Sequence, residues 1–199
     1  MFFGVDFDNT IADYDNLFFN LAFEKKYIPK EKKLGKKEIK EKLIAQGKEE
    51  DWRLLQSIAY GSRMIEADLA SGFSDFVQKA RSLDFNLSIV SHKTCFSNFT
   101  NNGVNLRDAA LRWMDKHKFF CSLGFSEDEI FFEDSRLCKI RRIKHLNFSH
   151  FVDDLVEIFQ NSSWPKNVKF LLLDKSKSCQ VEHINKFSSW HDINNSIFN

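Results

Sequence analysis

The chain has 199 residues, of which 43% are hydrophobic and 15% aromatic, enough for a packed core without stabilising disulfide bonds. Its 29 basic and 28 acidic residues give a formal net charge of +1, which argues against nucleic-acid and membrane-surface partners. Because a carboxylate stands as early as Asp6 and no apolar run approaches the roughly 18 residues of a membrane span, we expect a cytoplasmic protein that is not exported.

The spacing of cysteines and glycines excludes several kinds of site. The four cysteines form neither a C-x-x-C pair nor a zinc-ligand pattern, so we expect them to be reduced. The seven glycines are at least eleven residues apart, which excludes the G-x-G-x-x-G turn, the P-loop and the G-x-S-x-G elbow. Phosphate or ester chemistry in this chain must therefore use carboxylates, lysines and hydroxyl groups.

Short apolar runs that each end at a polar residue recur along the chain. They cover 2–5, 87–90, 130–132, 148–152 and 168–173, and are followed by Asp6, Ser91, Glu133, Asp153 and Asp174. Between them, the pattern predicts helices over 75–83, 106–116 and 136–146. This alternation is typical of buried parallel strands in a doubly wound α/β sheet, where ligands bind beyond the carboxyl ends of the strands. We therefore expect the polar residues to gather at one edge of the sheet.

An insertion separates the first two predicted strands. Asp6 and Ser91 are 85 residues apart, whereas a βαβ unit needs about 30, so roughly 55 residues are surplus. Their pattern predicts helices over 16–26, 36–47 and 51–69. We assign 15–71 to an all-helical cap, and 1–14 with 72–199 to an α/β core domain.

Two aspartates follow the first predicted strand. In extended chain the two-residue period turns Asp6 and Asp8 to the same side, so that their carboxylates converge. A calcium-binding EF-hand is excluded, because Ile11 and Leu17 stand where that loop needs Gly and Glu. Taken alone, the segment is also compatible with two aspartates that only cap a turn.

Four motifs follow one another in a recognisable order. They are Asp6-x-Asp8-x-Thr10, then Ser91 after a strand, then Lys139, then the pair Asp153-Asp154. With these motifs the chain resembles the haloacid dehalogenase (HAD) superfamily of aspartate-nucleophile phosphatases, over residues 1 to about 174. The resemblance implies a mostly parallel five-stranded sheet in the order 5-4-1-2-3, with the Asp6 strand at its centre. The insertion matches the position of the small helical cap in that superfamily.

The resemblance also implies chemical roles for the motif residues. Asp6 would attack phosphorus and form an aspartyl phosphate, while Asp8 would protonate the leaving oxygen and then activate water. Mg²⁺ would be the cofactor, bound by the side chains of Asp6 and Asp153 and the backbone carbonyl of Asp8. Asp154 is a further candidate metal ligand.

Several residues are candidates to bind the phosphate. Thr10, Ser91 and the backbone N–H groups of His92 and Lys93 lie in or beside the motifs, and the His92 ring is a candidate for substrate contact. Lys139 is the preferred lysine, because it lies in the first turn of its predicted helix. Lys144 would lie about 7 to 8 Å further along the helix axis. Lys93 remains the alternative.

The last predicted cap helix has a face that could bind a leaving group. Trp52, Gln56, Tyr60 and Arg63 fall on that face. The alternative is an exposed face with some aromatic packing.

These observations favour a Mg²⁺-dependent phosphatase that acts on a small phosphorylated metabolite. A phospho-accepting signalling receiver also uses acidic residues, a hydroxyl and a lysine. However, it carries its accepting aspartate two strands after the acidic pair, where this chain has Ser91 or Glu133, and it lacks a 55-residue insertion. A phosphomutase shares Asp6 and Asp8, and the sequence does not separate it from a phosphatase.

Overall fold

The computed structural model describes residues 1–30, 33–97, 99 and 103–199, and these form two compact units. The sheet unit consists of Met1–Ala12, Leu69–Lys93 and Lys118–Asn199, and the helical unit of Asp13–Asp68 and Thr94–His117. The helical unit therefore includes residues 94–117, which the sequence analysis assigned to the core domain. The predicted domain boundaries at residues 15 and 71 stay a prediction. None of the described helices is both long and apolar enough to cross a membrane.

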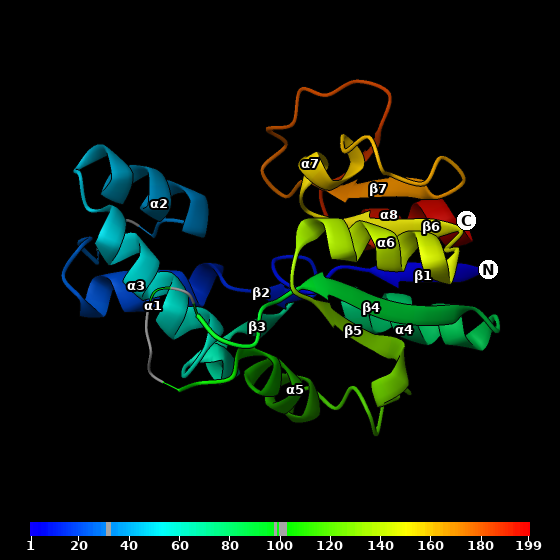
Figure 1. Cartoon of the computed structure of the whole chain (residues 1–199), viewed down its shortest axis with the longest axis horizontal. Helices are drawn as coiled ribbons and strands as arrows, with labels where there is room; N and C mark the ends of the chain where they lie inside the picture. The colour runs from blue at the N-terminus through cyan, green and yellow to red at the C-terminus, as the bar shows by residue number, and fades with distance from the viewer. Residues whose placement is uncertain (31–32, 98, 100–102) are drawn as a thin grey trace. The chain divides into compact units, whose positions relative to one another are not determined.

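The sheet unit contains six parallel strands (Figure 1). They are β1 (Phe2–Val5), β4 (Asn86–His92), β5 (Ile130–Glu133), β6 (His150–Asp153), β7 (Lys169–Leu173) and β8 (Asn185–Phe187). Their order, β5-β4-β1-β6-β7-β8, confirms the α/β class and the central position of the strand before Asp6. The predicted number of five strands is wrong, because β8 adds a sixth strand beyond β7.

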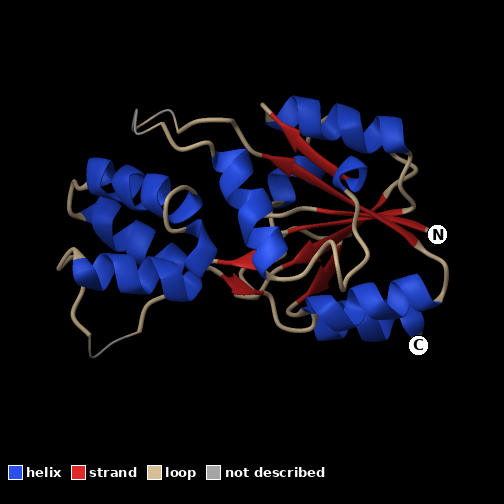
Figure 2. Ribbon diagram, turned by 90° about the horizontal axis from the view of Figure 1, so that it is seen from below, coloured by secondary structure: helices blue, strands red, loops and turns tan. Residues whose placement is uncertain are grey.

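Helices cover both faces of this sheet (Figure 2). The helices of the sheet unit are α4 (Phe73–Ser82), α6 (Arg136–Leu146), α7 (Val156–Phe159), α8 (Trp190–Phe198) and the 3₁₀ helix η2 (Glu127–Glu129). On one face, Phe76 of α4 packs against Phe3 and Trp190, with ring centroids 5.6 and 5.0 Å apart. On the other face Phe148 and Phe151 lie so close to Gly4 that no larger residue fits there without displacement. Neighbouring residues of β1 therefore contact opposite cores, as the strand period requires.

The helical unit is built around aromatic side chains. Its helices are α1 (Asp15–Glu24), α2 (Lys36–Ala45), α3 (Glu49–Tyr60), the 3₁₀ helix η1 (Met64–Glu66) and α5 (Leu106–Lys116). Phe18 stacks on the buried Trp52, with ring centroids 5.0 Å apart. The Lys36 ammonium lies 5.2 to 5.8 Å from the ring centroids of Tyr14, Phe18 and Tyr60, a distance at which cation–π attraction is favourable.

The predicted helix over 51–69 is too long. α3 ends at Tyr60, and Gly61 takes a backbone conformation that leaves the helix (φ −111°, ψ −106°). A Cβ at Gly61 would lie 2.7 Å from the Ser57 carbonyl oxygen, so only glycine permits this exit without a shift. The chain then forms η1 and the short strand β3 (Asp68–Leu69), which pairs with β2 (Ala12–Asp13).

Side-chain hydrogen bonds from α5 hold η1 and the residue that follows it. The Trp113 indole N–H donates to the Ala67 carbonyl (2.8 Å), and the Lys116 ammonium donates to the Ile65 carbonyl (2.6 Å). These bonds join two parts of the chain that are about fifty residues apart. They explain why α5 belongs to the helical unit and not to the sheet unit.

Candidate active site

The site lies where β1, β4 and β6 end side by side. Val5 pairs with Ile89 of β4 and with Val152 of β6, so that the three strands are in register at this edge. The Asp6 N–H donates to the Val152 carbonyl at 2.9 Å. Asp6 and Asp153 therefore leave adjacent strands at the same level, which brings their carboxyl groups together.

A tight turn follows β1 and carries Asp8. The N–H groups of Ile11 and Ala12 both donate to the Phe7 carbonyl (2.9 and 3.0 Å), and the Asn9 N–H donates to the Ala12 carbonyl (2.9 Å). Asn9 has a φ of +61°, a left-handed conformation that asparagine tolerates better than most residues. The turn thus coils the chain directly after Asp8, and Asp8 and Ala12 form a parallel bridge across it.

Lys139 joins the two buried aspartates. Its ammonium donates to Asp6 Oδ1 and to Asp153 Oδ2, at 2.6 Å in both cases. All three side chains are at least 94% buried. The lysine is directed into the site by its place in the first turn of α6, whose N-cap Ser135 accepts the Cys138 N–H (3.1 Å). Lys144, on the same helix, is exposed.

The electrostatics of this cluster follow from its burial. Burial raises the pKa of Asp6 to about 7, with Asp153 and Asp8 adding to the effect, although the attraction of Lys139 opposes it. For Lys139, burial alone would lower the pKa, but the ion pairs with Asp153 and Asp6 outweigh it and raise the pKa. The lysine is therefore charged, and the site concentrates negative charge around it.

Three carboxylates offer oxygen atoms to a metal ion. Asp6, Asp153 and Asp154 each place one ligand atom within 4.8 Å of the other two. Oxygens on opposite sides of an octahedral Mg²⁺ are about 4.2 Å apart, so this all-oxygen set fits that ion with small adjustments. Among the described residues, the Asp8 carboxylate is outside this group, so only the backbone carbonyl that the resemblance implies would make Asp8 a ligand.

A second buried lysine contacts Asp8. The Lys93 ammonium lies 3.0 Å from both carboxylate oxygens of Asp8. Sequence reasoning missed this pair, because the two residues are 85 positions apart and Lys93 follows a strand like any polar residue. The expectation that the Lys93 backbone N–H binds phosphate is corrected, since this N–H donates to the Glu133 carbonyl (2.9 Å).

The remaining motif residues differ in exposure. Ser91 is buried at the end of β4, while the next residue, His92, is exposed. Burial of part of the His92 ring lowers its pKa. Thr10 is fully buried, and its hydroxyl donates to Asp6 Oδ2 (3.3 Å). Its carbonyl accepts the Trp190 indole N–H (2.8 Å), so in this geometry Thr10 supports Asp6.

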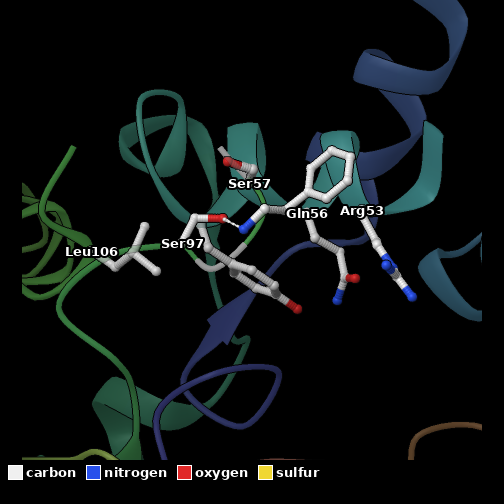
Figure 3. A pocket seen from close by; sticks show the side chains of 7 residues that line it. Arg53, Gln56, Ser57, Ser97 and Leu106 are labelled. Carbon is white, nitrogen blue, oxygen red and sulfur yellow. Dashed lines mark hydrogen bonds between the residues drawn. The ribbon is translucent and has the colours of Figure 1, made fainter. Parts of the chain in front are cut away.

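The helical unit contains a cavity of about 310 Å³. It is lined by Arg53, Gln56, Ser57, Tyr60, Ser97, Phe99 and Leu106. Figure 3 shows Arg53 and Gln56 extending side by side from α3, with Ser97 and Leu106 across the cavity. The Ser97 hydroxyl accepts the Phe99 N–H (3.2 Å). Arg53, Gln56, Ser57, Tyr60 and Ser97 contribute polar groups to the lining, and Phe99 and Leu106 contribute apolar surface, so the cavity suits a ligand with both polar and apolar parts.

The structure brings together only two of the four predicted leaving-group residues. Gln56 and Tyr60 line the cavity, and Arg53 and Ser57 could have been found from the same helical spacing. Trp52 is buried against Phe18.

Arg63 lies beyond the end of α3, where its guanidinium pairs with Glu24 and with Glu66 (2.6 Å). Both Trp52 and Arg63 thus contact other side chains of the helical unit, and their part in substrate binding stays a prediction.

No protein-family model matches the sequence, and no curated protein does either. The fold, however, is similar to that of several HAD hydrolases of known structure. Bacillus subtilis YfnB, described as a HAD hydrolase bound to magnesium, aligns over 100% of this chain and 98% of its own, with a TM-score of 0.58 and 16% identity. A HAD-superfamily hydrolase of Geobacter sulfurreducens aligns over 98% and 95% (TM-score 0.55, 12% identity).

A Lactobacillus plantarum protein described as a phosphoglycolate phosphatase aligns over 96% of both chains, with a TM-score of 0.51 and 16% identity. At these identities the likeness concerns the fold. It confirms the HAD-like fold that the sequence motifs implied.

Proposed function

We propose that this protein is a Mg²⁺-dependent phosphatase that hydrolyses a small phosphorylated metabolite through an aspartyl phosphate on Asp6. The observation that carries the proposal is the placement of Asp6 at the carboxyl end of the central strand, 2.6 Å from the buried Lys139 ammonium. A carboxylate that attacks a phosphate dianion meets like-charge repulsion, and a fixed buried cation reduces it. The phosphatase described for one fold relative supports the same class of reaction.

The proposed reaction has two displacements. In the first, an Asp6 carboxylate oxygen bonds to phosphorus, the ester P–O bond breaks, and Asp8 gives its proton to the leaving oxygen. In the second, Asp8 takes a proton from water, the water oxygen bonds to phosphorus, and the bond to Asp6 breaks. The products are the alcohol and inorganic phosphate, and both aspartates return to their starting states.

Asp6, Asp153, Asp154 and the backbone carbonyl of Asp8 would hold the magnesium ion. The ion would supply positive charge to the phosphoryl oxygens. The magnesium described for YfnB supports this cofactor. The Thr10 hydroxyl donates a hydrogen bond to the Asp6 carboxylate. Ser91 and Lys139 are the proposed phosphate contacts of this chain.

We propose that Gln56 and Tyr60, which line the cavity of the helical unit, bind the organic part of the substrate. The hydroxyl, amide and guanidinium groups of the cavity suit a polar leaving group. Gln56→Ala should change the relative kcat/KM values among phosphate esters, but spare a small activated ester whose leaving group offers Gln56 nothing to bind. An equal loss on every ester would remove Gln56 from substrate binding.

The test of the reaction is a panel of phosphorylated metabolites, assayed for phosphate release with and without Mg²⁺. We expect release from at least one compound, dependence on Mg²⁺, and no release by a folded Asp6→Asn variant. Turnover by that variant would refute the assignment of Asp6. If no compound yields phosphate but the chain becomes stably phosphorylated by a small phosphodonor, the receiver alternative replaces the phosphatase. Conversion of one phosphate ester into its isomer would indicate the phosphomutase.

The role of Asp8 needs a separate measurement. Asp8→Asn should reduce turnover by about 10² to 10⁴-fold, the usual contribution of a general base. An activated ester needs little protonation of its leaving group, so the first displacement should suffer less and phosphorylated Asp6 should accumulate. Rapid quenching followed by intact-mass measurement detects this adduct. Wild-type turnover in Asp8→Asn would remove Asp8 from the reaction.

A further inference from the structure

We propose that Lys93 is a positioning residue that holds the Asp8 carboxylate in place, and that it is not a ligand of the substrate phosphate. This inference rests on the proposed function, in which Asp8 moves protons. Its basis is the contact of the Lys93 ammonium with both Asp8 oxygens, each at 3.0 Å. A contact with two oxygens restricts the rotation of the carboxylate more than a contact with one.

Contacts hold both the backbone and the ammonium group of Lys93. Its backbone N–H donates to Glu133 at the end of β5 (2.9 Å), so the main chain continues the sheet. Its ammonium lies 5.6 Å from the centroid of the Phe7 ring, within cation–π range. Only 2% of the Lys93 side chain is exposed, against 21% of that of Asp8. A rigid, buried cation thus contacts a carboxylate that has access to solvent.

Asp8 needs such support because of its place in the chain. It lies in the turn after β1, next to Asn9 in its left-handed conformation, and not within a strand or helix. A group that transfers protons must meet both the leaving oxygen and the attacking water, and misplacement of about 1 Å can cost 10²-fold in rate. A side chain on a turn reaches that accuracy only when neighbouring groups hold it.

The two buried lysines of the site serve different carboxylates. Lys139 contacts Asp6 and Asp153 at 2.6 Å, while Lys93 contacts Asp8 at 3.0 Å. Lys139 remains the proposed phosphate lysine, because it contacts Asp6, the residue that would bond to phosphorus.

The kinetic test compares Lys93→Met with the wild type in saturating Mg²⁺. Methionine keeps an unbranched side chain of similar length but has no ammonium. We expect kcat to fall about 10- to 100-fold on esters with poor leaving groups, and to fall less on an activated aryl phosphate. The exposed Lys144 provides the matched control, and Lys144→Met should leave kcat unchanged. Lys93→Arg should recover part of the loss, because guanidinium also binds both oxygens of a carboxylate.

Binding of inorganic phosphate separates positioning from phosphate contact. Calorimetric titration in Mg²⁺ should give phosphate affinities for Lys93→Met within about 3-fold of the wild type, whereas removal of a direct charged contact should cost about 10-fold or more. A phosphate affinity that falls 10-fold while kcat is retained would overturn the proposal.

A double-mutant cycle on unfolding tests the contact without any activity. If Lys93 holds Asp8, then Asp8→Asn should shift the unfolding midpoint by different amounts in the wild-type and Lys93→Met backgrounds. Strictly additive shifts would overturn the proposal. A wild-type protein that releases no phosphate from any ester would refute the proposed function, and the cycle would still decide whether Lys93 holds Asp8.

Discussion

Replacement of Asp6 by asparagine should shift the stability of the metal-free protein in favour of the variant as the pH rises, although it abolishes catalysis. Burial raises the pKa of Asp6 from 3.8 to about 7, despite the opposing attraction of Lys139. Between these pH values the folded chain retains a proton that the unfolded chain has released. The stability that Asp6 contributes is therefore present below about pH 4 and is lost as the pH rises to about 7. Asparagine is neutral throughout and has nearly the same shape.

The size of the effect follows from this difference in pKa. At about 1.36 kcal/mol per pH unit, it corresponds to at most about 4 kcal/mol in the free energy of unfolding. We expect the stability difference between Asp6→Asn and the wild type to grow by about 2 to 4 kcal/mol from about pH 4.5 to about pH 8. The difference should move in favour of the variant as the pH rises, because only the wild type must ionise Asp6, whereas Asp153 is buried in both proteins.

Urea unfolding in the presence of a chelator, at several pH values, measures this difference. Asp115→Asn is the matched control for the removal of a carboxylate, because Asp115 is exposed. Added Mg²⁺ should then favour the wild type, by about 2.7 kcal/mol at 100 times the Kd, if the asparagine variant has lost most of its affinity. A stability difference that stays constant with pH, or that increasingly favours the wild type as the pH rises, would refute this electrostatic account.

Three further substitutions probe the sheet unit. Gly4→Ala should destabilise the protein by about 1–3 kcal/mol in urea unfolding, because a Cβ there would lie 2.4 Å from a ring carbon; Gly35→Ala, with no atom nearer than 3.6 Å, should cost clearly less. Trp190→Phe removes the donor to the Thr10 carbonyl and should lower the free energy of unfolding by about 1–3 kcal/mol. If the variant matches the wild type, the hydrogen bond contributes nothing. Burial lowers the pKa of His150 below 6.5, so wild-type stability should fall as the pH drops through that value, and His150→Phe should reduce this pH dependence of unfolding.

The sequence predicted the central part of the sheet unit because buried parallel strands are apolar runs. The strand β1 and the polar residue after it were recognisable without any knowledge of their partners. The strand β8 was not, because it has three residues, of which Asn185 and Lys186 are exposed. It exists through pairing with β7, which is a tertiary interaction. The length of α3 was overestimated because the helical periodicity continues past Gly61, where the backbone departs from the helix.

The candidate site was predicted to a similar extent and for a similar reason. Residues directly after strands, such as Asp6 and Asp153, share an edge by topology alone, and Lys139 could be chosen by its place in the first turn of a helix. The contact between Lys93 and Asp8 depends on side-chain direction at the end of β4. Lysines at the surface give the same sequence pattern, so burial of Lys93 could be learned only from the structure.

The short strand β8 also has a consequence for colloidal behaviour. Without β8, β7 would be an edge strand of the sheet. β7 carries the buried apolar residues Phe170 to Leu173. An unpaired margin of that composition is a template on which strands of other molecules can add, a route to aggregation. β8 covers it with only three residues and places Lys186 at the new margin. A short edge strand and a lysine on it both discourage the addition of further strands, so β8 helps to prevent aggregation of the chain.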